Sequence, residues 1–506
     1  MGYEAVVVGG GLGGLSAAIR LAADGHRVTV LEKNERAGGK LNVRSGKGFT
    51  FDTGPSILTM PWVLEQLFES AGRRLEDYLT VVRVEPQWRT FFEDGVKLDL
   101  VGDFPSMLEE IKRVSPADAS GFLSYLQYAQ KMYDLTMKGF YRRSLSGLTD
   151  LRSRHTMPEL ISMDPLKSMH QSTAKYIKDP HLRQLFDFFI MYIGSSPYAA
   201  PAILSQLAYV QLGLGIYYVE GGMYRIAEAM LKLLGELGVT VKTSSPVEQV
   251  LADGRRATGV RLASGETVEA DLVVCNLEAI PAHKSILKQQ QGAAEAADKL
   301  SKYAPAVSGL VLLLGLDGKY DQLAHHNFFF SHSPEREFGD MFDKGIPTED
   351  PTVYVGVSSK SDPTQAPEGK DNLFVLTHVP PLKDGETWEG HRERYRELVL
   401  DKLERNGLAG LRSRIEFEYV FTPDDLRELY GANGGSIYGV VTDRKLNGGF
   451  KVPSKSELLD NLYFVGGSTH PGGGVPMVTL SGQLTADLIR EQWEAESGSA
   501  AVRKGG

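Results

Sequence analysis

The feature that most constrains the fold of this chain is a glycine-rich turn between an apolar segment and a helical pattern near the N-terminus. Ala5 to Val8 is an apolar, largely β-branched run of the kind found in buried strands of parallel sheets. Gly9-x-Gly11-x-x-Gly14 follows it without a gap. In this spacing the first glycine allows a tight turn, the second lets the backbone approach a pyrophosphate, and the third lets helix and strand pack closely. The turn therefore predicts a dinucleotide-binding unit.

The residues after the turn complete this pattern. A helix is predicted from Leu15, with Gly25 at its end, and phosphates would lie at its N-terminus, where free N–H groups favour anions. Val28 to Leu31 is the second predicted strand, and Glu32 follows it near the offset of about 20 residues at which a carboxylate binds ribose hydroxyls. A carboxylate at this position disfavours a ribose that carries a 2′-phosphate.

A second glycine pair bears on the choice between FAD and NAD. Arg36-Ala-Gly-Gly-Lys40 has the form of the segment that lies beside the same pyrophosphate in two-dinucleotide-binding-domain flavoproteins, and it resembles FAD enzymes of the amine oxidase and phytoene desaturase type. A solvated basic loop is the alternative for this segment taken alone. No second glycine motif follows a strand elsewhere, so the sequence indicates no site for a nicotinamide cofactor.

Composition excludes several classes of protein. The chain has 506 residues, 42% of them hydrophobic, which is enough for a large core and about two or three domains. A net charge of −9 gives no reason to expect nucleic acid as a partner. The single cysteine, Cys275, lies in an apolar run that predicts a buried strand, and it fits a reducing cytosol. The 11 histidines show no metal-ligand spacing, so no metal is expected.

The sequence predicts a cytoplasmic protein that associates peripherally with the cytoplasmic membrane. The N-terminus lacks the charge pattern of a secretory signal, and the most apolar stretch, Ala306 to Leu316, is too short to span a bilayer. One region of this acidic chain is locally basic. Its basic residues are Lys138, Arg142, Arg143, Arg152 and Arg154, and they are set against one acidic residue, Asp150. A solvated helix face is the ordinary interpretation, and contact with anionic lipid headgroups is the alternative.

The predicted fold class is α/β, with an FAD-binding Rossmann-type domain of the amine oxidase-like kind. This domain is expected to be discontinuous, with residues 1–103, 218–283 and 455–495. Residues 104–217 are predicted as a helical insert that covers the substrate and faces the membrane, and residues 284–454 as a mixed α+β substrate domain. Residues 496–506 are predicted as a flexible tail.

Separate segments of the chain resemble bacterial phytoene desaturase-type carotenoid desaturases and oxidases. They include Phe51-Asp-x-Gly-Pro-Ser56 and Tyr192-x-Gly-x-Ser-Pro-Tyr-x-Ala-Pro201, which lies in an aromatic run that either forms core or lines a site for a long apolar ligand. The segments most similar to the diapocarotenoid terminal oxidases of that family are 55–61, 87–89, 324–330, 436–441 and 476–482. Thr469-His-Pro471 looks more like the desaturating branch.

This resemblance implies an FAD-dependent enzyme of carotenoid biosynthesis. The expected substrate is a C30 diapocarotenoid whose terminal methyl is oxidised to an aldehyde by hydride transfer to flavin, with oxygen or a membrane quinone as the electron acceptor. Such a substrate has no polar handle, so its binding must come from burial in an apolar tunnel, at about 25 cal/mol per Å². The alternatives are a desaturase that acts on phytoene or diapophytoene, an amine oxidase, and a prenyl-protein escort protein without redox activity.

The motifs and the resemblance together predict the cofactor site. In the family, the residue at Val247 contacts the adenine end of FAD through its backbone, and the segments around Gly54 and Gly467 lie near the flavin ring. Asp52 either serves as a catalytic carboxylate or holds a turn, and no catalytic residue is assigned. The residues expected to bind FAD are Gly9, Gly11, Leu12, Gly13, Gly14, Glu32, Lys33, Gly39, Lys40, Gly54, Pro55, Ser56, Val247, Gly466, Gly467, Pro476, Met477 and Val478.

Overall fold

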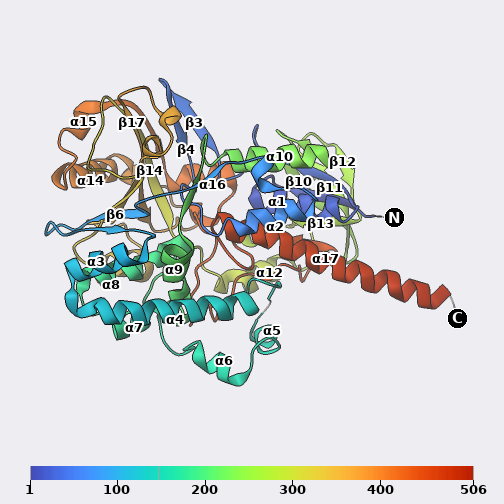
Figure 1. Ribbon diagram of the computed structural model, residues 1–506. Coiled ribbons are helices and arrows are strands. Elements are labelled where there is room, and N and C mark those ends of the chain that lie inside the picture. Colours follow the sequence, from blue (N-terminus) through green and yellow to red (C-terminus); the bar gives the residue numbers. More distant parts are fainter. Residues whose placement is uncertain (1, 146, 505–506) are drawn as a thin grey trace.

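Two large sheets and a layer of helices form the molecule (Figure 1). The computed structural model describes residues 2–145 and 147–504, with side chains as far as residue 495. The two sheets lie side by side, α3, α4, α7 and α8 lie below the left-hand sheet, and α5 and α6 project farthest down. Among the described residues, no helix combines the length and the apolar character that crossing a membrane requires.

The first sheet has five parallel strands. Its order is β19 (Leu462–Phe464), β13 (Leu272–Cys275), β1 (Glu4–Val8), β2 (Arg27–Leu31) and β9 (Thr240–Lys242). Three distant parts of the chain therefore meet in one sheet. Helix α1 (Leu12–Ala23) packs against α10 (Arg225–Glu236) and α17 (Val475–Lys504). The sheet confirms the predicted α/β class, because its strands are parallel and its central strand precedes the glycine turn.

Helix α1 begins three residues before the predicted start at Leu15. Gly11 is extended and precedes the helix, and its carbonyl accepts the first helical bond from the Leu15 N–H at 2.9 Å. The first turn of the helix contains two glycines. Glycine has a low helix propensity, so the sequence pattern did not predict this turn as helical. A Cβ at Gly14 would lie 2.2 Å from the carbonyl oxygen of Gly9, so this close approach needs glycine.

A three-stranded antiparallel sheet extends this part of the molecule. It consists of β10 (Val247–Asp253), β11 (Arg256–Leu262) and β12 (Thr267–Glu269). Short helices α11 (Ala279–Lys284) and α12 (Ala293–Lys299) follow β13. Cys275 ends β13 and is fully buried, as its apolar surroundings predicted.

The second large sheet has seven strands. Its order is β18 (Ile415–Phe421), β14 (Ser308–Leu316), β17 (Asp371–Val379), β16 (Val353–Gly356), β15 (His326–Phe329), β6 (Trp88–Phe91) and β7 (Lys97–Leu100). One face of β14, with Leu312 and Leu314, packs with side chains of α14 (Arg392–Arg405). The other face, with Val311 and Leu313, joins the main core. The alternation follows from the two-residue repeat of a strand.

The position of β6 and β7 corrects one predicted boundary. The sequence assigned residues 1–103 to the FAD-binding domain, yet these two strands belong to the second sheet, where β6 pairs in parallel with β15. Strand pairing across such a distance depends on which edges meet in space, and local sequence carries no signal for it. The other predicted domain boundaries stay predictions.

Helices make up most of the described chain between residues 104 and 214. They include α3 (Phe104–Val114), α4 (Ala119–Lys138), α5 (Leu148–Arg152), α6 (Met157–Ser162), α7 (Met169–Tyr176), α8 (Pro180–Phe188) and α9 (Gln206–Tyr209). The side chains of Asp103, Thr156, Ser168 and Asp179 cap four of them. A two-stranded antiparallel ribbon pairs β5 (Val81–Arg83), which precedes these helices in the chain, with β8 (Tyr217–Val219), which follows them.

A glycine turn separates β8 from the next helix. Tyr218 lies in β8, and α10 begins only at Arg225 because Gly221 and Gly222 form a turn with positive φ. The predicted tail from residue 496 continues as helix to Lys504, while residues 505 and 506 lie outside the described residues. The remaining elements are β3 (Val43–Gly46), β4 (Phe49–Asp52), α2 (Trp62–Ser70), α13 (Pro334–Phe338), α15 (Leu411–Arg414) and α16 (Pro423–Tyr430).

Candidate cofactor and substrate site

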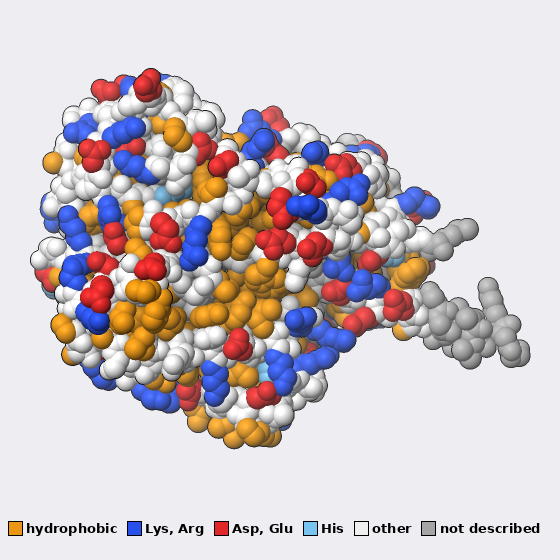
Figure 2. Space-filling model, viewed as in Figure 1, with side chains coloured by type: hydrophobic (Ala, Val, Ile, Leu, Met, Phe, Trp, Pro, Cys, Tyr) orange, Lys and Arg blue, Asp and Glu red, His pale blue; other side chains and the backbone are white. Residues whose placement is uncertain are grey.

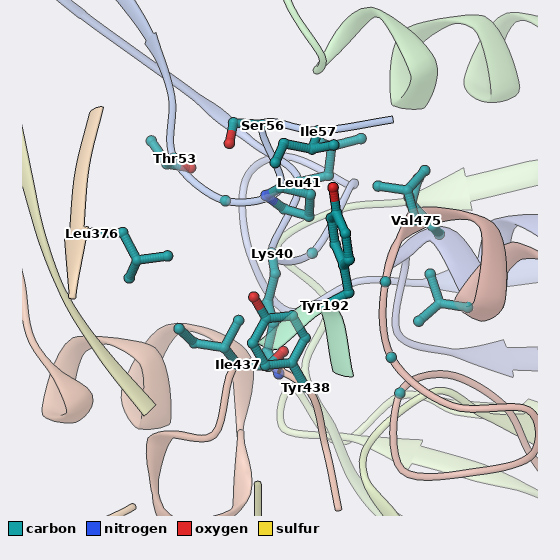
Figure 3. Close-up of a pocket in the computed structure, with 18 of the residues that line it drawn as sticks. Lys40, Leu41, Thr53, Ser56, Ile57, Tyr192, Leu376, Ile437, Tyr438 and Val475 are labelled. Carbon is teal, nitrogen blue, oxygen red and sulfur yellow. Dashed lines mark hydrogen bonds between the residues drawn. The ribbon is translucent and has the colours of Figure 1, made fainter. Parts of the chain in front are cut away.

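One cavity lies between the two sheets and has walls of two kinds (Figure 3). Backbone of the glycine segments forms the first wall, from the turn before α1, the 38–41 loop, the 53–57 loop and the loop before α17. Aromatic and aliphatic side chains form the second wall, mostly from the seven-stranded sheet and from α8 and the residues that follow it. We refer to the first wall as the glycine cradle and to the second as the aromatic chamber.

The glycine cradle is shaped so that side chains are excluded from it. A Cβ at Gly11 would lie 2.6 Å from Nδ2 of Asn276, and a Cβ at Gly13 would lie 3.0 Å from the backbone of Gly466. Gly39 has φ +62, and its Cβ would lie 3.0 Å from the Cα of Gly11. Bare backbone at the N-terminus of α1 is the arrangement that binds a pyrophosphate. The residues present therefore fit the phosphates of a dinucleotide.

Glu32 is held rigidly at the end of β2. Its side chain is buried; Oε2 accepts a hydrogen bond from the N–H of Gly10 at 2.7 Å, and Oε1 accepts one from the N–H of Asn34 at 2.8 Å. A carboxylate has about four lone-pair sites, so these two bonds leave acceptor capacity for ribose hydroxyls. Glu32 itself does not line the cavity, so its contact with the ribose hydroxyls stays a prediction.

The two predicted lysines differ in their positions. Lys40 lines the cavity, and its ammonium donates to the carbonyls of Ser436 and Ile437 at 2.7 and 3.1 Å and lies 3.3 Å from Glu278. It therefore fastens the cradle to the neighbouring loop. Lys33 does not line the cavity, because its ammonium turns away to the carbonyl of Glu428 at 2.7 Å.

The structure brings most of the predicted residues to one cavity. Those that line it are Gly11, Leu12, Gly13, Gly39, Lys40, Gly54, Pro55, Ser56, Gly466, Gly467 and Val478. Those that do not are Gly9, Gly14, Glu32, Lys33, Val247, Pro476 and Met477. Met477 packs instead with a separate apolar cluster that includes Met60, because it lies on another face of α17 from Val478. Direct contact of each residue with the cofactor stays a prediction.

The aromatic chamber contains residues that sequence reasoning did not single out. Trp88 and Phe328 have ring centroids 4.0 Å apart, and Phe328 lies 5.0 Å from Tyr354. Further lining side chains are Phe188, Met191, Tyr192, Val311, Phe374, Leu376, His378, Ile437 and Tyr438. Phe188, Met191 and Tyr192 come from the aromatic run for which a lining role was one of two interpretations. Trp88, Phe328, Ile437 and Tyr438 lie in segments that carry the resemblance to the diapocarotenoid oxidases, although no lining role was predicted for them. The remaining residues lie on strands and were not singled out, because strand residues that face a cavity have the same alternation as strand residues that face a core.

A few polar groups interrupt this apolar wall. His378 lines the cavity, its Nε2 is buried without a hydrogen-bond partner among the described residues, and burial lowers its pKa to about 3. The ring is therefore neutral at physiological pH. Tyr192 and Tyr438 point their rings into the same space (Figure 3). Burial raises the pKa of Tyr192 far above its ordinary value, so this group too stays neutral.

Asp52 does not line the cavity, although it lies directly before the 53–57 loop. Its Oδ1 accepts a hydrogen bond from the N–H of Met223 at 2.9 Å, and burial raises its pKa to about 7. It therefore anchors the turn before α10, and a catalytic role for it stays unassigned. No group of three or more potential metal ligands occurs in the described part of the chain.

A backbone cradle at the carboxyl edge of a parallel sheet, an acid fixed after the second strand and an adjoining apolar chamber define a flavin-dependent oxidoreductase. Comparison with known proteins agrees. The model of the family described as flavin containing amine oxidoreductase matches residues 12–490, so the chain belongs to this family. FAD is accordingly its cofactor, as predicted, and the residues of the glycine cradle would hold it.

Named relatives narrow the position within the family. The chain is 46% identical to a 4,4'-diapolycopene oxygenase of Methylomonas sp, over 96% of this chain and 97% of that protein. It is 43% identical to a 4,4'-diaponeurosporene oxygenase of Staphylococcus aureus, with the same coverage. These relatives confirm the resemblance to the diapocarotenoid oxidases. The solved structure of an oxidoreductase from Methanosarcina mazei matches 96% of this chain and all of that chain with a TM-score of 0.66 at 19% identity, which shows the shared fold.

Proposed function

We propose that this protein is an FAD-dependent oxidase of carotenoid biosynthesis that converts the terminal methyl group of a C30 diapocarotenoid to an aldehyde. The names of two relatives that match nearly the whole chain support the substrate class. The observation that carries the proposal is the direct opening of the glycine cradle into the aromatic chamber within one cavity. A long apolar molecule in the chamber would thus bring its end to the cofactor.

The chamber suits a ligand without polar groups along its length. Trp88, Phe188, Phe328 and Phe374 are each less than a tenth exposed, and they offer ring faces and edges to the cavity. Burial of apolar surface against such a wall contributes about 25 cal/mol per Å², and a polyene has a large surface to bury. The same rings exclude bulk water from the reacting end.

Bound FAD would supply a two-electron acceptor next to the chamber. Conversion of a terminal methyl to an aldehyde breaks two C–H bonds and forms a C=O bond, and with dioxygen as the overall oxidant one methyl and one O2 give one aldehyde and one water. The protein contributes the orientation of the terminal carbon and the dry wall around it. Oxygen or a membrane quinone accepts the electrons in this proposal.

Two alternatives receive less support. A desaturase was suggested by Thr469-His-Pro471, but His470 does not line the cavity, and its Nε2–H donates to the carbonyl of Phe140 at 2.7 Å. An amine oxidase would need a group that binds an ammonium. The one acidic side chain among the described residues that line the cavity is Glu278, and it already pairs with Lys40 at 3.3 Å.

Product analysis tests the proposal. The purified FAD-loaded protein is incubated with a C30 and with a C40 polyene, under air and under nitrogen. We expect a terminal aldehyde from the C30 substrate under air. A product with additional conjugated double bonds and no oxygen, formed equally under nitrogen with a soluble quinone, would assign the protein to the desaturases instead.

We propose further that the protein contacts an anionic membrane from its cytoplasmic side through the segment around α5 and α6. Four large apolar side chains in this segment are exposed, by 64% at Leu148, 61% at Met157, 67% at Ile161 and 88% at Leu166. Apolar atoms gather at the lower tip of the molecule, where α6 projects (Figure 2). Apolar insertion flanked by basic groups is the pattern of peripheral membrane binding.

Ion pairs within the protein reduce the number of basic side chains that are free to bind anionic lipid. Lys138 pairs with Glu159 at 2.7 Å, and Arg143 pairs with Glu491 at 3.3 Å, so two of the five predicted basic residues are partly neutralised. Arg142, Arg152 and Arg154 form no ion pair with other described residues. Sedimentation with vesicles of anionic lipid tests the contact: Ile161→Ser with Leu166→Ser should reduce binding several-fold, while Ile346→Ser, at an exposed site outside the segment, should not.

A further inference from the structure

A row of hydrogen-bonded side chains passes from the cavity into the seven-stranded sheet. Ser56 and Tyr354 both line the cavity, and their hydroxyl oxygens are 2.8 Å apart. On its other side the Tyr354 hydroxyl lies 2.8 Å from Nδ1 of His326, whose side chain is fully buried behind the cavity wall. Three groups that can each accept and donate a proton are thus joined in sequence, beginning at the cavity surface.

Beyond His326 the hydrogen bonds are interrupted, and a ring contact leads toward the surface of the protein. Nε2 of His326 is buried without a hydrogen-bond partner among the described residues. The ring of His325 lies 4.2 Å from the ring of His326, measured between centroids. Nδ1 of His325 in turn lies 2.6 Å from Oγ of Ser361, which is exposed to solvent. Two adjacent histidines therefore lie between the cavity and the solvent.

The proposed reaction creates a need for such a path. Oxidation of a terminal alcohol to an aldehyde releases a hydride from carbon and a proton from oxygen. The aromatic chamber has no free carboxylate among its described lining residues, and its walls are mostly apolar, so a proton released there has no local base of ordinary strength. Neutral hydroxyl and imidazole groups can transfer it without holding a permanent charge.

We propose that Ser56, Tyr354 and His326 form a relay that takes the hydroxyl proton of the alcohol intermediate and passes it through His325 and Ser361 to solvent. This inference rests on the proposed function, since it needs an oxygenated substrate end in the cavity. Ser56 and Tyr354 would touch the substrate oxygen and act as catalytic residues. His326 and His325 would act through Tyr354.

The step balances as follows. The alcohol O–H bond breaks and its proton passes to Oγ of Ser56, the Ser56 proton passes to Tyr354, and the Tyr354 proton passes to Nδ1 of His326. A C–H bond gives its electron pair and hydrogen to the two-electron acceptor that the proposed function already requires, and the C=O bond forms. His326 gives up its Nε2 proton as it takes one at Nδ1, the ring of His325 accepts that proton, and the Nδ1 proton of His325 passes to Oγ of Ser361 and from there to solvent. Burial lowers the pKa of His325 to about 3 and that of His326 well below its ordinary value, so neither ring keeps an added proton.

The test supplies the FAD-loaded protein with the C30 terminal alcohol and measures aldehyde formation in single turnover, in H2O and in D2O. Tyr354→Phe and His326→Asn are the main variants, and Ser56→Ala is a third that leaves the Tyr354–His326 bond in place. His326→Asn keeps a partner for the Tyr354 hydroxyl but cannot take a proton at one atom and release it at another. Tyr320→Phe is the matched control, because its hydroxyl bonds the carbonyls of Leu408 and Ala409 outside the cavity.

We expect Tyr354→Phe and His326→Asn to slow aldehyde formation roughly 10²-fold, in line with the usual contribution of proton transfer, so that the supplied alcohol is consumed more slowly. The solvent isotope effect of the wild type should shrink in these variants, while FAD content and melting temperature stay near those of Tyr320→Phe. If His326→Asn oxidises the alcohol at the wild-type rate, the relay is wrong, even if the wild type makes aldehyde as proposed. If the wild type makes no aldehyde, the proposed function itself fails.

Discussion

The two walls of the cavity are built on different principles. The glycine cradle consists of backbone, and at Gly11 a single added Cβ would lie 2.6 Å from a neighbouring side chain. The aromatic chamber consists of side chains from β6, β14, β15, β16, β17 and α8, which touch one another through ring contacts such as the 4.0 Å approach of Trp88 and Phe328. A side chain added to the cradle should therefore abolish its function. The chamber consists of many apolar contacts, so the loss of one contact should weaken substrate binding only slightly.

The largest effect should follow from filling the cradle. In Gly11→Val a branched side chain would occupy the space where the phosphates lie, so FAD affinity should fall by roughly 10²-fold or more, which corresponds to at least about 2.7 kcal/mol. The flavin absorbance of the purified protein and its titration with FAD measure this change. Gly235→Ala in α10, where an added Cβ meets nothing within 4 Å, is the control and should bind FAD normally. If the Gly11→Val protein is purified with one FAD per chain, the glycine cradle does not hold the phosphates, and the contrast between the two walls is wrong.

A second prediction concerns the junction between the two walls. Asp52 precedes the 53–57 loop, and burial raises its pKa to about 7 from an ordinary value of 3.8. Between these values the unfolded chain releases a proton that the folded chain keeps. The free energy of unfolding should therefore fall as the pH rises from about 4 to about 7, by up to about 1.4 kcal/mol per pH unit from this group.

Asp52→Asn removes this titration and keeps an oxygen that can accept the N–H of Met223. Its unfolding free energy, measured in urea at several pH values, should depend less on pH than that of the wild type, and the difference should favour the variant more at pH 8 than at pH 5. Asp253→Asn, at an exposed position in β10, is the matched control for the loss of one carboxyl group. If the unfolding free energies of the wild type and Asp52→Asn depend on pH in the same way, folding does not raise the pKa of Asp52.

The smallest effect is expected in the chamber. Phe188 is 4% exposed and lines the cavity. Phe188→Leu should cost about 1 kcal/mol of unfolding free energy and raise KM for the polyene a few-fold, because the remaining rings still bury the substrate. FAD content should not change. Comparison of KM, kcat and FAD content between this variant and Gly11→Val measures how far the two walls act independently, and loss of FAD from Phe188→Leu would show that they do not.

Local sequence was sufficient where a structural element is defined by its own residues. The predicted strands from Ala5 to Val8 and from Val28 to Leu31 are β1 and β2, each apart from its first residue. The glycine spacing predicted the turn before α1, because a strand that enters a helix directly over a pyrophosphate needs glycine at fixed positions. The predicted start of α1 was three residues too late, because Gly11, Gly13 and Gly14 are typical of a loop and have a low helix propensity.

The amino-acid sequence alone determined the glycine cradle, the acid after the second strand and the family, because these depend on residues close together in the chain or on motifs that persist as units. Tertiary structure decided which side chains meet in the chamber. It joined β6 to β15, placed Tyr354 between Ser56 and His326, and turned Met477 away from the cavity while Val478 faces it. These contacts join residues up to hundreds of positions apart, and their geometry depends on how two sheets pack, which no local pattern records.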